Sequence, residues 1–443
     1  MACVIDNHAP RALTLLARPI KPLIAKSLVP SEKSVLIVAY HFPPHAGSSG
    51  FLRSVKFARY LPDYGWKPMI LTTSPGAYER LDYGPLKDVP VCVPIHRAPA
   101  LDTKRHLSVR GRYPRMIALP DRWVSWTLTA VPAGLRVIRS RKVGVLLTTY
   151  PIATAVLIGL ILHRLSSIPW VVDFRDSMTE DNWPPDPTTH RVYTWIERQA
   201  LRHAALLIFT AAASRDMCLR RNPQLSPSRC VVVPNGYDEE DFRDLKTILP
   251  AEPKKRLSLV HSGLMDPKER DPSPFFEALA TLKGNSIVSG ETLSVELRAP
   301  GSEAHYQRMI EDFRIGDLVH ILPPLPYRDS IADAAKADAL LLFQAKSVDH
   351  QIPAKTYEYL RLRKPILAVV SPSGETAQLL DRIHAATIVD ITNTDAIGRV
   401  LPSFLDAVRS RTHPLADLET ISGFSRQAQA GALARCLDGL VGA

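Results

Sequence analysis

The sequence has few cysteines and no cysteine pattern that would build a disulfide framework or a zinc site. Its 443 residues include five cysteines, an odd number without a Cys-x-x-Cys pair. They are scattered over the chain at Cys3, Cys92, Cys218, Cys230 and Cys436. This usage predicts free thiols and a reducing compartment.

Long hydrophobic runs are also missing. The nearest candidate for a membrane span, Val143–Leu162, is interrupted by Pro151, so its pattern predicts a buried strand followed by a buried helix. The mildly apolar residues Ala12–Leu28 are interrupted by basic residues and prolines, so no signal peptide is expected. The expected location is the cytoplasm, with the inner face of a membrane as a candidate site of peripheral attachment.

Several motifs of nucleotide and metal sites do not occur. The absence of G-x-G-x-x-G and of G-x-x-x-x-G-K-[S/T] argues against ordinary dinucleotide and P-loop sites. The sequence has neither Asp-x-Asp nor a dense cluster of Asp, Glu and His, so no metal and no other cofactor is expected. It also lacks a basic platform interleaved with aromatic residues, so nucleic acid is not an expected partner.

What is present is the composition of a globular protein with a basic surface. Apolar residues make up 46% and charged residues 22% of the chain, which allows large cores in two or three domains. The net charge is +11, from 55 Lys and Arg residues against 44 Asp and Glu residues. This charge favours acidic partners, such as nucleotides or an anionic membrane surface, without choosing between them.

The order of the predicted elements indicates an α/β protein with two doubly wound, Rossmann-like domains. Solidly apolar strands alternate with helices, as in parallel sheets that are covered on both faces. We expect a basic extension at 1–32, a first domain at 33–238, a linker at 239–256, a second domain at 257–420 and a final segment at 421–443. Two such sheets would direct the loops after their strands into a shared cleft.

Two loops of the first domain carry candidate site residues. Small and polar residues follow the first predicted strand, where backbone N–H groups could approach a phosphate or a sugar. A plain tight turn would explain the same residues. The candidates are His45, Gly47, Ser48 and Arg53.

A second polar loop follows the predicted strand Trp170–Phe174. Asp173, Arg175 and Asp176 could act on sugar hydroxyls or on an acceptor nucleophile, and we take them as the candidate catalytic residues. They could equally pair with one another.

The second domain supplies the candidate donor-binding residues. Gly263 is followed by Lys268 and Arg270, cations that could neutralise a leaving diphosphate without a metal, although a solvated charge run has the same pattern. A helix that opens at Pro353 carries Lys355 and Glu358 one turn apart on the same side of its start.

The strand Ile366–Val370 follows this helix, and the loop after it is a further candidate. Gly374 and Glu375 open the next helix there and could bring backbone amides to the same phosphate.

Five motifs in this order resemble the GT-B-fold, family 4-like glycosyltransferases of bacterial polysaccharide and glycolipid biosynthesis. They are Tyr40–Pro44 with Gly47, Asp173–Asp176, Val233–Asp238, His261–Gly263 and Pro353–Leu360. The resemblance runs from about residue 34 to the C-terminus. It implies a nucleotide-sugar donor in the second domain, a glycan or lipid-linked acceptor in the first, and metal-independent transfer with retention of configuration.

The resemblance also implies roles for single residues. Glu358 matches the second Glu of the family's E-x7-E motif, which holds the donor ribose, and Lys268 or Arg270 matches the cations at the diphosphate. Gly47 matches the glycine loop beside that diphosphate, and the last helix is expected to pack back on the first domain. His45, Ser48 and Arg53 are taken as the candidate acceptor-binding residues.

The sequence departs from the family pattern at several positions. His350 stands where the first Glu of E-x7-E is usual, Leu264 where an Arg follows the glycine, and Arg363 where a glycine precedes Lys-Pro. The Asp173–Asp176 loop replaces a version that contains His. Two other hypotheses therefore stay open, a nucleotide-sugar epimerase and a GT-B scaffold without catalysis.

Overall fold

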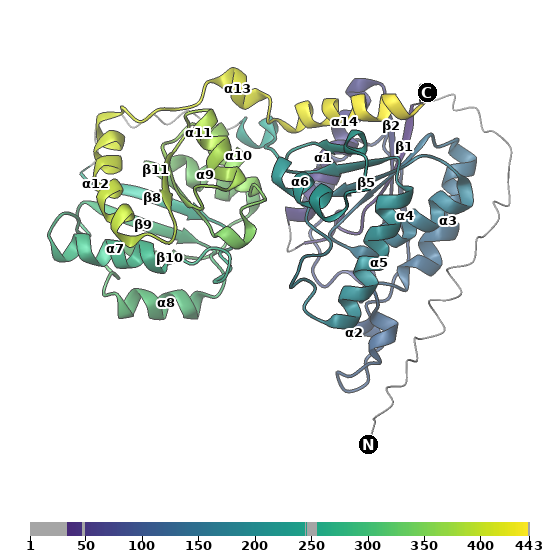
Figure 1. Ribbon diagram of the computed structural model, residues 1–443, viewed down its shortest axis with the longest axis horizontal. Coiled ribbons are helices and arrows are strands. Elements are labelled where there is room, and N and C mark those ends of the chain that lie inside the picture. Colours follow the sequence, from purple (N-terminus) through teal and green to yellow (C-terminus); the bar gives the residue numbers. More distant parts are fainter. Residues whose placement is uncertain (1–32, 47–48, 244, 246–254, 442–443) are drawn as a thin grey trace.

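The structure, a computed structural model, describes residues 33–46, 49–243, 245 and 255–441. These residues form two α/β units side by side, each built on one parallel sheet (Figure 1). The predicted α/β fold class is therefore confirmed. The predicted extension 1–32, the candidates Gly47 and Ser48, and most of the predicted linker lie outside the described residues.

The N-terminal unit has a seven-stranded sheet in the order β3-β2-β1-β4-β5-β6-β7, with parallel pairing throughout. Its inner strands are buried along their whole length, which explains their continuous runs of Val, Ile and Leu. The strands are β1 Ser34–Val38, β2 Lys67–Thr73, β3 Ile95–Ala98, β4 Val145–Thr149, β5 Trp170–Phe174, β6 Leu206–Phe209 and β7 Cys230–Val232.

Helices cover both faces of this sheet. α3, α4 and α5 pack on one face, and α1 packs on the other together with the last helix of the chain, α14. The helices of this unit are α1 Leu52–Tyr60, α2 Thr103–His106, α3 Trp126–Arg141, α4 Ala153–Ser166, α5 Pro187–His203 and α6 Ala212–Arg221.

The C-terminal unit repeats the architecture with six parallel strands in the order β10-β9-β8-β11-β12-β13. α7, α8 and α12 cover one face, and α9, α10 and α11 cover the other. The strands are β8 Leu257–Ser262, β9 Leu293–Arg298, β10 Val319–Leu322, β11 Ala339–Gln344, β12 Ile366–Val370 and β13 Thr387–Asp390. The helices are α7 Ser273–Gly284, α8 Glu303–Asp312, α9 Tyr327–Lys336, α10 Ala354–Leu362, α11 Glu375–Arg382, α12 Thr394–Ser410, α13 Leu418–Ser422 and α14 Arg426–Val441.

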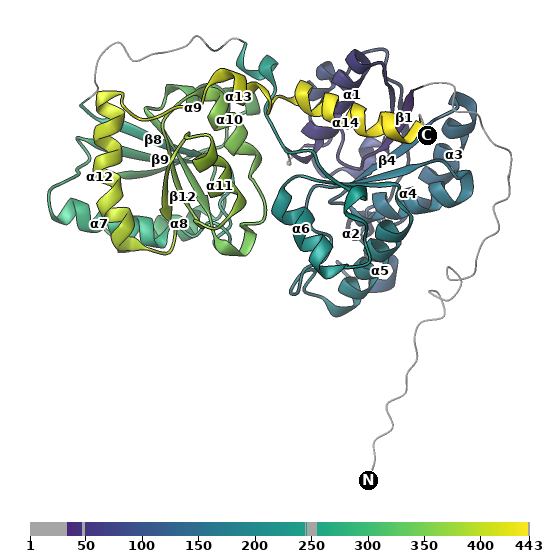
Figure 2. The same cartoon turned by 45° about the horizontal axis from the view of Figure 1, so that its top comes forward.

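The chain crosses between the units twice, and the two crossings touch. The end of the first unit pairs with the returning segment before α14 through a bridge between Tyr237 and Ser425. A Cβ atom at Gly236 would lie 1.9 Å from the carbonyl oxygen of Phe424, so only glycine allows this approach. α14 then lies across the N-terminal unit against α1 in both ribbon views (Figure 2).

Some elements were not predicted from the sequence. β3 is an edge strand whose residues include His96 and Arg97, so it lacks the apolar run of the inner strands. α2 and α13 are too short to show helical periodicity. In the described part of the chain, no helix combines the length and the apolar character that a membrane span requires.

Candidate active site

On the N-terminal side of the junction between the units, Arg53 and Asp173 form a buried ion pair. The Nε and Nη2 atoms of Arg53 donate to the two carboxylate oxygens of Asp173 at 2.9 and 3.0 Å. The same guanidinium donates to the carbonyl oxygens of Val233 and Pro234 at 2.9 and 2.8 Å. Arg53 thereby connects α1, the end of β5 and the first crossing between the units.

This pairing bears on two sequence predictions, which stay predictions. Arg53 was expected to contact an acceptor and Asp173 to take part in catalysis, but their side chains are only 1% and 2% exposed. Their polar atoms bind each other and the backbone, so in this structure neither side chain faces a substrate. The structure gives them a positioning role, because a bidentate buried pair holds its elements in one geometry.

The two neighbouring candidates lie nearer to the surface. Arg175 donates through Nη1 to the carbonyl oxygen of Gly50, and its backbone carbonyl accepts from Thr210 at 3.0 Å. Its Nε atom is buried and has no hydrogen-bond partner within the described ranges of the chain. The side chain of Asp176 is exposed. Of the three catalytic candidates, Arg175 and Asp176 therefore stay available at the junction.

On the C-terminal side, Lys355 lies against a buried histidine at the end of β8. His261 is fully buried, and its Nδ1 lies 2.9 Å from the carbonyl oxygen of Leu341. A carbonyl accepts only, so Nδ1 carries the proton and Nε2 accepts from the Lys355 ammonium at 2.9 Å. Burial, followed by the positive charge of Arg270, lowers the pKa of Lys355 to about 7.

A glycine leaves room beside this ammonium. Gly263 has a φ of +94°, and a Cβ atom there would lie 3.4 Å from Lys355 Nζ. Arg270 is partly buried, pairs with Glu269 at 3.2 Å, and has a buried Nε without a partner. Lys268 is exposed to solvent. Of the two cations considered for the diphosphate, the structure therefore brings Arg270 to the Lys355 cluster.

Leu264 stands at the position where the family pattern has an Arg. Its side chain is 71% exposed, so this position contributes an apolar surface and no cation. The positive charge next to Gly263 comes instead from Lys355 and Arg270.

The second motif carboxylate, Glu358, lies one turn along α10 from Lys355. It accepts from the Tyr327 hydroxyl at 2.7 Å, and its enclosure at the junction raises its pKa. Arg426, the first residue of α14, is nearby and only 6% exposed. Burial, and then the charge of Arg53, lowers the pKa of Arg426 to about 10. Glu358 thus lies among several cations on this side of the junction.

The loop with Gly374 and Glu375 contacts the N-terminal unit. The Gly374 amide donates to the Ser371 carbonyl at 3.0 Å, and the Glu375 amide donates to the Asp349 carbonyl at 2.8 Å. The Glu375 carboxylate accepts from the Ala213 amide of the N-terminal unit at 2.5 Å. These groups are bonded within the protein, and the role of the loop at a phosphate stays a prediction. The loop joins the two units.

His350, which replaces the first Glu of the motif, makes a second bridge between the units. Its Nε2 lies 3.3 Å from Oε1 of Glu180, and this contact is the leading cause of the lowered pKa of Glu180. The backbone carbonyl of His350 accepts from the Ser214 hydroxyl at 2.7 Å. His350 therefore connects the C-terminal unit to Glu180 and Ser214 of the N-terminal unit.

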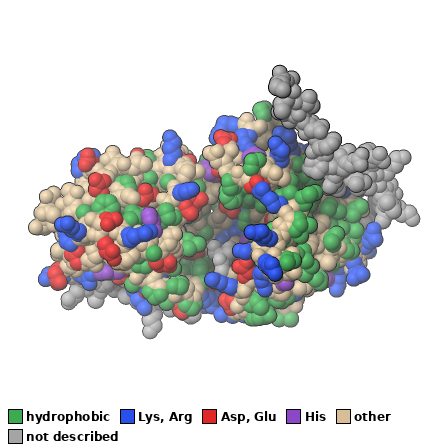
Figure 3. All heavy atoms as spheres, turned by 90° about the horizontal axis from the view of Figure 1, so that it is seen from below, with side chains coloured by type: hydrophobic (Ala, Val, Ile, Leu, Met, Phe, Trp, Pro, Cys, Tyr) green, Lys and Arg blue, Asp and Glu red, His purple; other side chains and the backbone are tan. Residues whose placement is uncertain are grey.

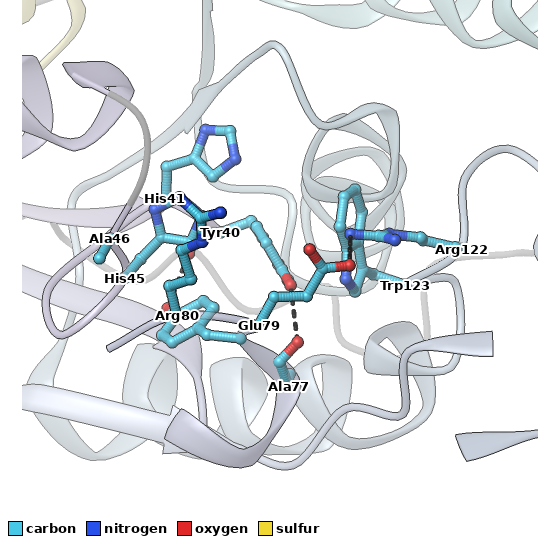
Figure 4. A pocket seen from close by; sticks show the side chains of 10 residues that line it. Tyr40, His41, His45, Ala46, Ala77, Glu79, Arg80, Arg122 and Trp123 are labelled. Atoms are coloured by element: carbon cyan, nitrogen blue, oxygen red, sulfur yellow. Dashed lines mark hydrogen bonds and ion pairs between the residues drawn. The ribbon is translucent and has the colours of Figure 1, made fainter. Parts of the chain in front are cut away.

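A separate pocket of about 310 Å³ opens in the N-terminal unit, at the carboxyl ends of β1 and β2 (Figure 4). The rings of His41 and His45 lie 4.5 Å apart at its edge, and Tyr40 and Trp123 lie 4.5 Å apart behind them. The lining residues are Tyr40, His41, His45, Ala46, Ala77, Tyr78, Glu79, Arg80, Arg122 and Trp123. The candidate His45 thus lines a cavity of the size that small ligands occupy.

Three polar side-chain atoms of the lining have no hydrogen-bond partner among the described residues. Nδ1 of His41, Nδ1 of His45 and Nε1 of Trp123 are buried without a hydrogen-bond partner. Burial lowers the pKa values of both histidines, that of His41 to about 3, so both rings are neutral at pH 7. Neutral imidazoles and an indole N–H match hydroxyl groups, which both donate and accept.

Sequence reasoning missed several residues of these sites. Glu180, Tyr327 and Arg426 come from elements distant in sequence, and no local pattern marks them. Trp123 had a weak signal, because it directly follows the Arg-rich section that ends at Arg122. Among the residues that the structure describes, no three His, Cys, Asp or Glu side chains gather as a metal site would require.

Comparisons with known proteins bear on both units. The family model for the glycosyl transferase 4-like domain matches residues 53–236. Curated protein sequences gave no match. Sucrose-phosphate synthase from Thermosynechococcus elongatus is similar in structure, with a TM-score of 0.63 and 14% identity over 93% of this chain and 100% of the other.

Two further solved structures are similar over the whole chain. HepE from Anabaena, in complex with UDP and glucose, has a TM-score of 0.62 and 14% identity over 92% of this chain and 100% of its own. A UDP-N-acetylglucosamine 2-epimerase from Listeria monocytogenes has a TM-score of 0.56 and 13% identity over 92% of this chain and 96% of its own. Residues 53–236 therefore match the model of the glycosyl transferase 4-like domain, and the chain as a whole has the GT-B fold.

Proposed function

We propose that the protein is a glycosyltransferase that moves a sugar from a nucleoside-diphosphate sugar to a glycan or lipid-linked acceptor. The observation that carries the proposal is the cluster of Lys355, Arg270 and Glu358 beside Gly263, at the junction of two GT-B units. The crystallised HepE holds UDP and glucose, which makes UDP-sugars the first donors to test.

The cluster has the chemistry that a departing nucleoside diphosphate requires. As the bond between the sugar and the diphosphate breaks, negative charge grows on the phosphate oxygens. Lys355 and Arg270 would neutralise that charge, and Gly263 has no side chain between the loop and the Lys355 ammonium. Glu358 would accept hydrogen bonds from the donor ribose. We propose a reaction that needs no metal and retains the anomeric configuration, as the family resemblance implies.

The pocket of the N-terminal unit is the proposed acceptor site. Its neutral histidines and the Trp123 indole would hydrogen-bond to sugar hydroxyls, and the rings of Tyr40 and Trp123 would pack on a sugar face. Arg80 is exposed at the rim and has no charged partner among the described residues. We place the reaction in the synthesis of cell-surface glycans, in which the growing glycan is the acceptor.

An epimerase is the second candidate, because the Listeria epimerase shares the fold over the whole chain. Epimerisation would need an acid and a base on either side of the sugar, and the described junction residues offer no evident pair. Radiolabelled UDP-sugars, incubated with the protein and a lipid extract, separate the two. Label in a lipid or polymer fraction supports transfer, whereas label in an epimeric UDP-sugar supports the second candidate and contradicts the first.

A further inference from the structure

A segment of the N-terminal unit, residues 101–117, projects from the body of the fold and is not used by the proposed site. It includes α2 and the loop after it, at the bottom of the N-terminal unit in Figure 1. Val109 and Arg112 exchange backbone hydrogen bonds of 2.9 and 3.0 Å around a tight turn. Arg110 and Gly111 have positive φ values of 51° and 76°, so the turn is of the primed type and presents Arg110 at its tip.

This surface, which we call the 101–117 surface, exposes apolar side chains that the fold could have buried. Val109 is 76% and Met116 67% exposed. Leu101, Leu107 and Ile117 are also exposed. Seen from this side, hydrophobic side chains and Lys and Arg side chains lie intermixed on the N-terminal unit (Figure 3).

The charges among these apolar side chains have one sign. The exposed cations are Lys104, Arg105, Arg110, Arg112 and Arg115. Asp102 is the acidic residue of the segment, and it is buried, where it caps α2. Arg115 pairs with Asp186, and Arg105 donates to a backbone carbonyl. Arg110 and Arg112 have no acidic partner among the residues that the structure describes, whereas Lys104 lies near Glu79 and helps to lower its pKa.

We propose that the 101–117 surface docks the protein on an anionic membrane. Apolar side chains would enter the interface between lipid headgroups and acyl chains, and the cations would contact lipid phosphates. A second copy of the chain is a less suitable partner for this surface, because dimerisation would bring two basic surfaces together and their charges would repel. The inference rests on the proposed function in one respect: it makes the acceptor of that reaction a lipid-linked glycan.

The surface is tied to the proposed acceptor pocket by direct contacts. Arg105 donates through Nη1 to the carbonyl oxygen of Tyr78 at 2.6 Å. Asp102 pairs with Arg122 at 3.4 Å. Tyr78 and Arg122 both line the pocket, so docking would hold the pocket close to the membrane surface. A headgroup at the bilayer surface could then enter the pocket while its lipid stays in the membrane.

The test is sedimentation of the full-length protein with vesicles, either of phosphatidylcholine alone or of phosphatidylglycerol and phosphatidylcholine in equal parts. We expect binding to the anionic vesicles. Because each cation near such a surface contributes about a fivefold gain in affinity, Arg110→Glu with Arg112→Glu should weaken binding about 25-fold or more. Met116→Glu should weaken it too, whereas Ile287→Glu, at an exposed apolar position of the C-terminal unit, should not.

Three results would overturn the proposal. The first is that the wild type does not bind anionic vesicles. The second is that the Arg110/Arg112 and Met116 variants both bind as the wild type does. The third is concentration-dependent self-association that Met116→Glu abolishes. The melting shift with UDP-glucose, measured on the same variants, tests the proposed donor site separately from membrane docking. Variants that lose vesicle binding but keep that shift support docking, and a missing shift in the wild type with intact docking contradicts only the proposed donor.

Discussion

The burial of Lys355 beside Arg270, which lowers its pKa, predicts that donor binding takes up a proton. In the free protein the pKa of Lys355 is about 7, so about nine tenths of the side chains are neutral at pH 8. A diphosphate beside the ammonium favours its charged form and raises this pKa. Binding of UDP-glucose at pH 8 should therefore take up about 0.9 proton, and binding at pH 6 about 0.1.

The affinity follows from the same linkage. Between pH 7 and the higher pKa of the bound state, the dissociation constant should rise about tenfold per pH unit, or about 1.4 kcal/mol. Calorimetry in two buffers of different ionisation enthalpy measures the proton count directly. UDP-glucose is the better ligand for this experiment than UDP, because a terminal phosphate titrates near pH 6 itself.

Two variants test whether Lys355 is the group responsible. Lys355→Met should weaken binding at pH 6.5 about 10- to 100-fold, from the loss of one charged hydrogen bond, and abolish the proton uptake. Lys268→Met, which removes an exposed cation of the same half of the site, should change neither value appreciably. Equal proton uptake by wild type and Lys355→Met would refute the reasoning.

The stability of the free protein should respond to Lys355→Met in the opposite direction from donor binding. The folded-state pKa of Lys355 lies below the ordinary value of 10.5. Below pH 7 the buried side chain is charged, which lowers the free energy of unfolding of the protein. This destabilisation is relieved as the pH rises from about 7 towards 10.5, where the unfolded chain also loses the proton. Without ligand at pH 6.5, Lys355→Met should therefore melt no lower than the wild type.

Three further substitutions probe the frame and the donor site. Gly236→Ala should lower the free energy of unfolding in urea by about 1–3 kcal/mol, because its Cβ would collide with the returning segment at Phe424. Gly439→Ala should not lower it, because nothing lies within 4 Å of the added Cβ. Equal effects of the two substitutions would contradict the crossing geometry. Arg53→Met should cost about 3–5 kcal/mol by leaving the Asp173 carboxylate buried and unpaired, and a loss below 1 kcal/mol would contradict that pairing. Glu358→Gln should weaken UDP-glucose binding about tenfold in calorimetry without lowering the melting temperature of the free protein.

The sequence predicted the architecture because buried parallel strands leave a local signal. β5 and β12 have the predicted bounds, since each is an apolar run between polar residues. The edge strand β3 was missed because half of its residues are polar. The loops that follow the strands were therefore located correctly, even where the roles of their side chains were not.

The partners of the polar residues could not be predicted, because they depend on long-range packing. Arg53 and Asp173 lie 120 positions apart, and Lys355 and His261 lie 94 apart. A polar residue at a strand end has the same pattern whether it faces a ligand or a buried partner. Arg426 had no signal, since its place at the junction depends on the return of α14.

The most direct test of the donor site is the melting temperature of the full-length protein with UDP, GDP, ADP and CMP, each with and without EDTA. A ligand at 100 times its dissociation constant adds about 2.7 kcal/mol to the stability of the folded protein. The account predicts that one nucleoside diphosphate raises the melting temperature with or without EDTA, and that Arg270→Met and Glu358→Gln reduce this shift. A wild-type protein that responds to none of them, or variants that respond as the wild type does, would contradict a donor site at Lys355, Arg270 and Glu358.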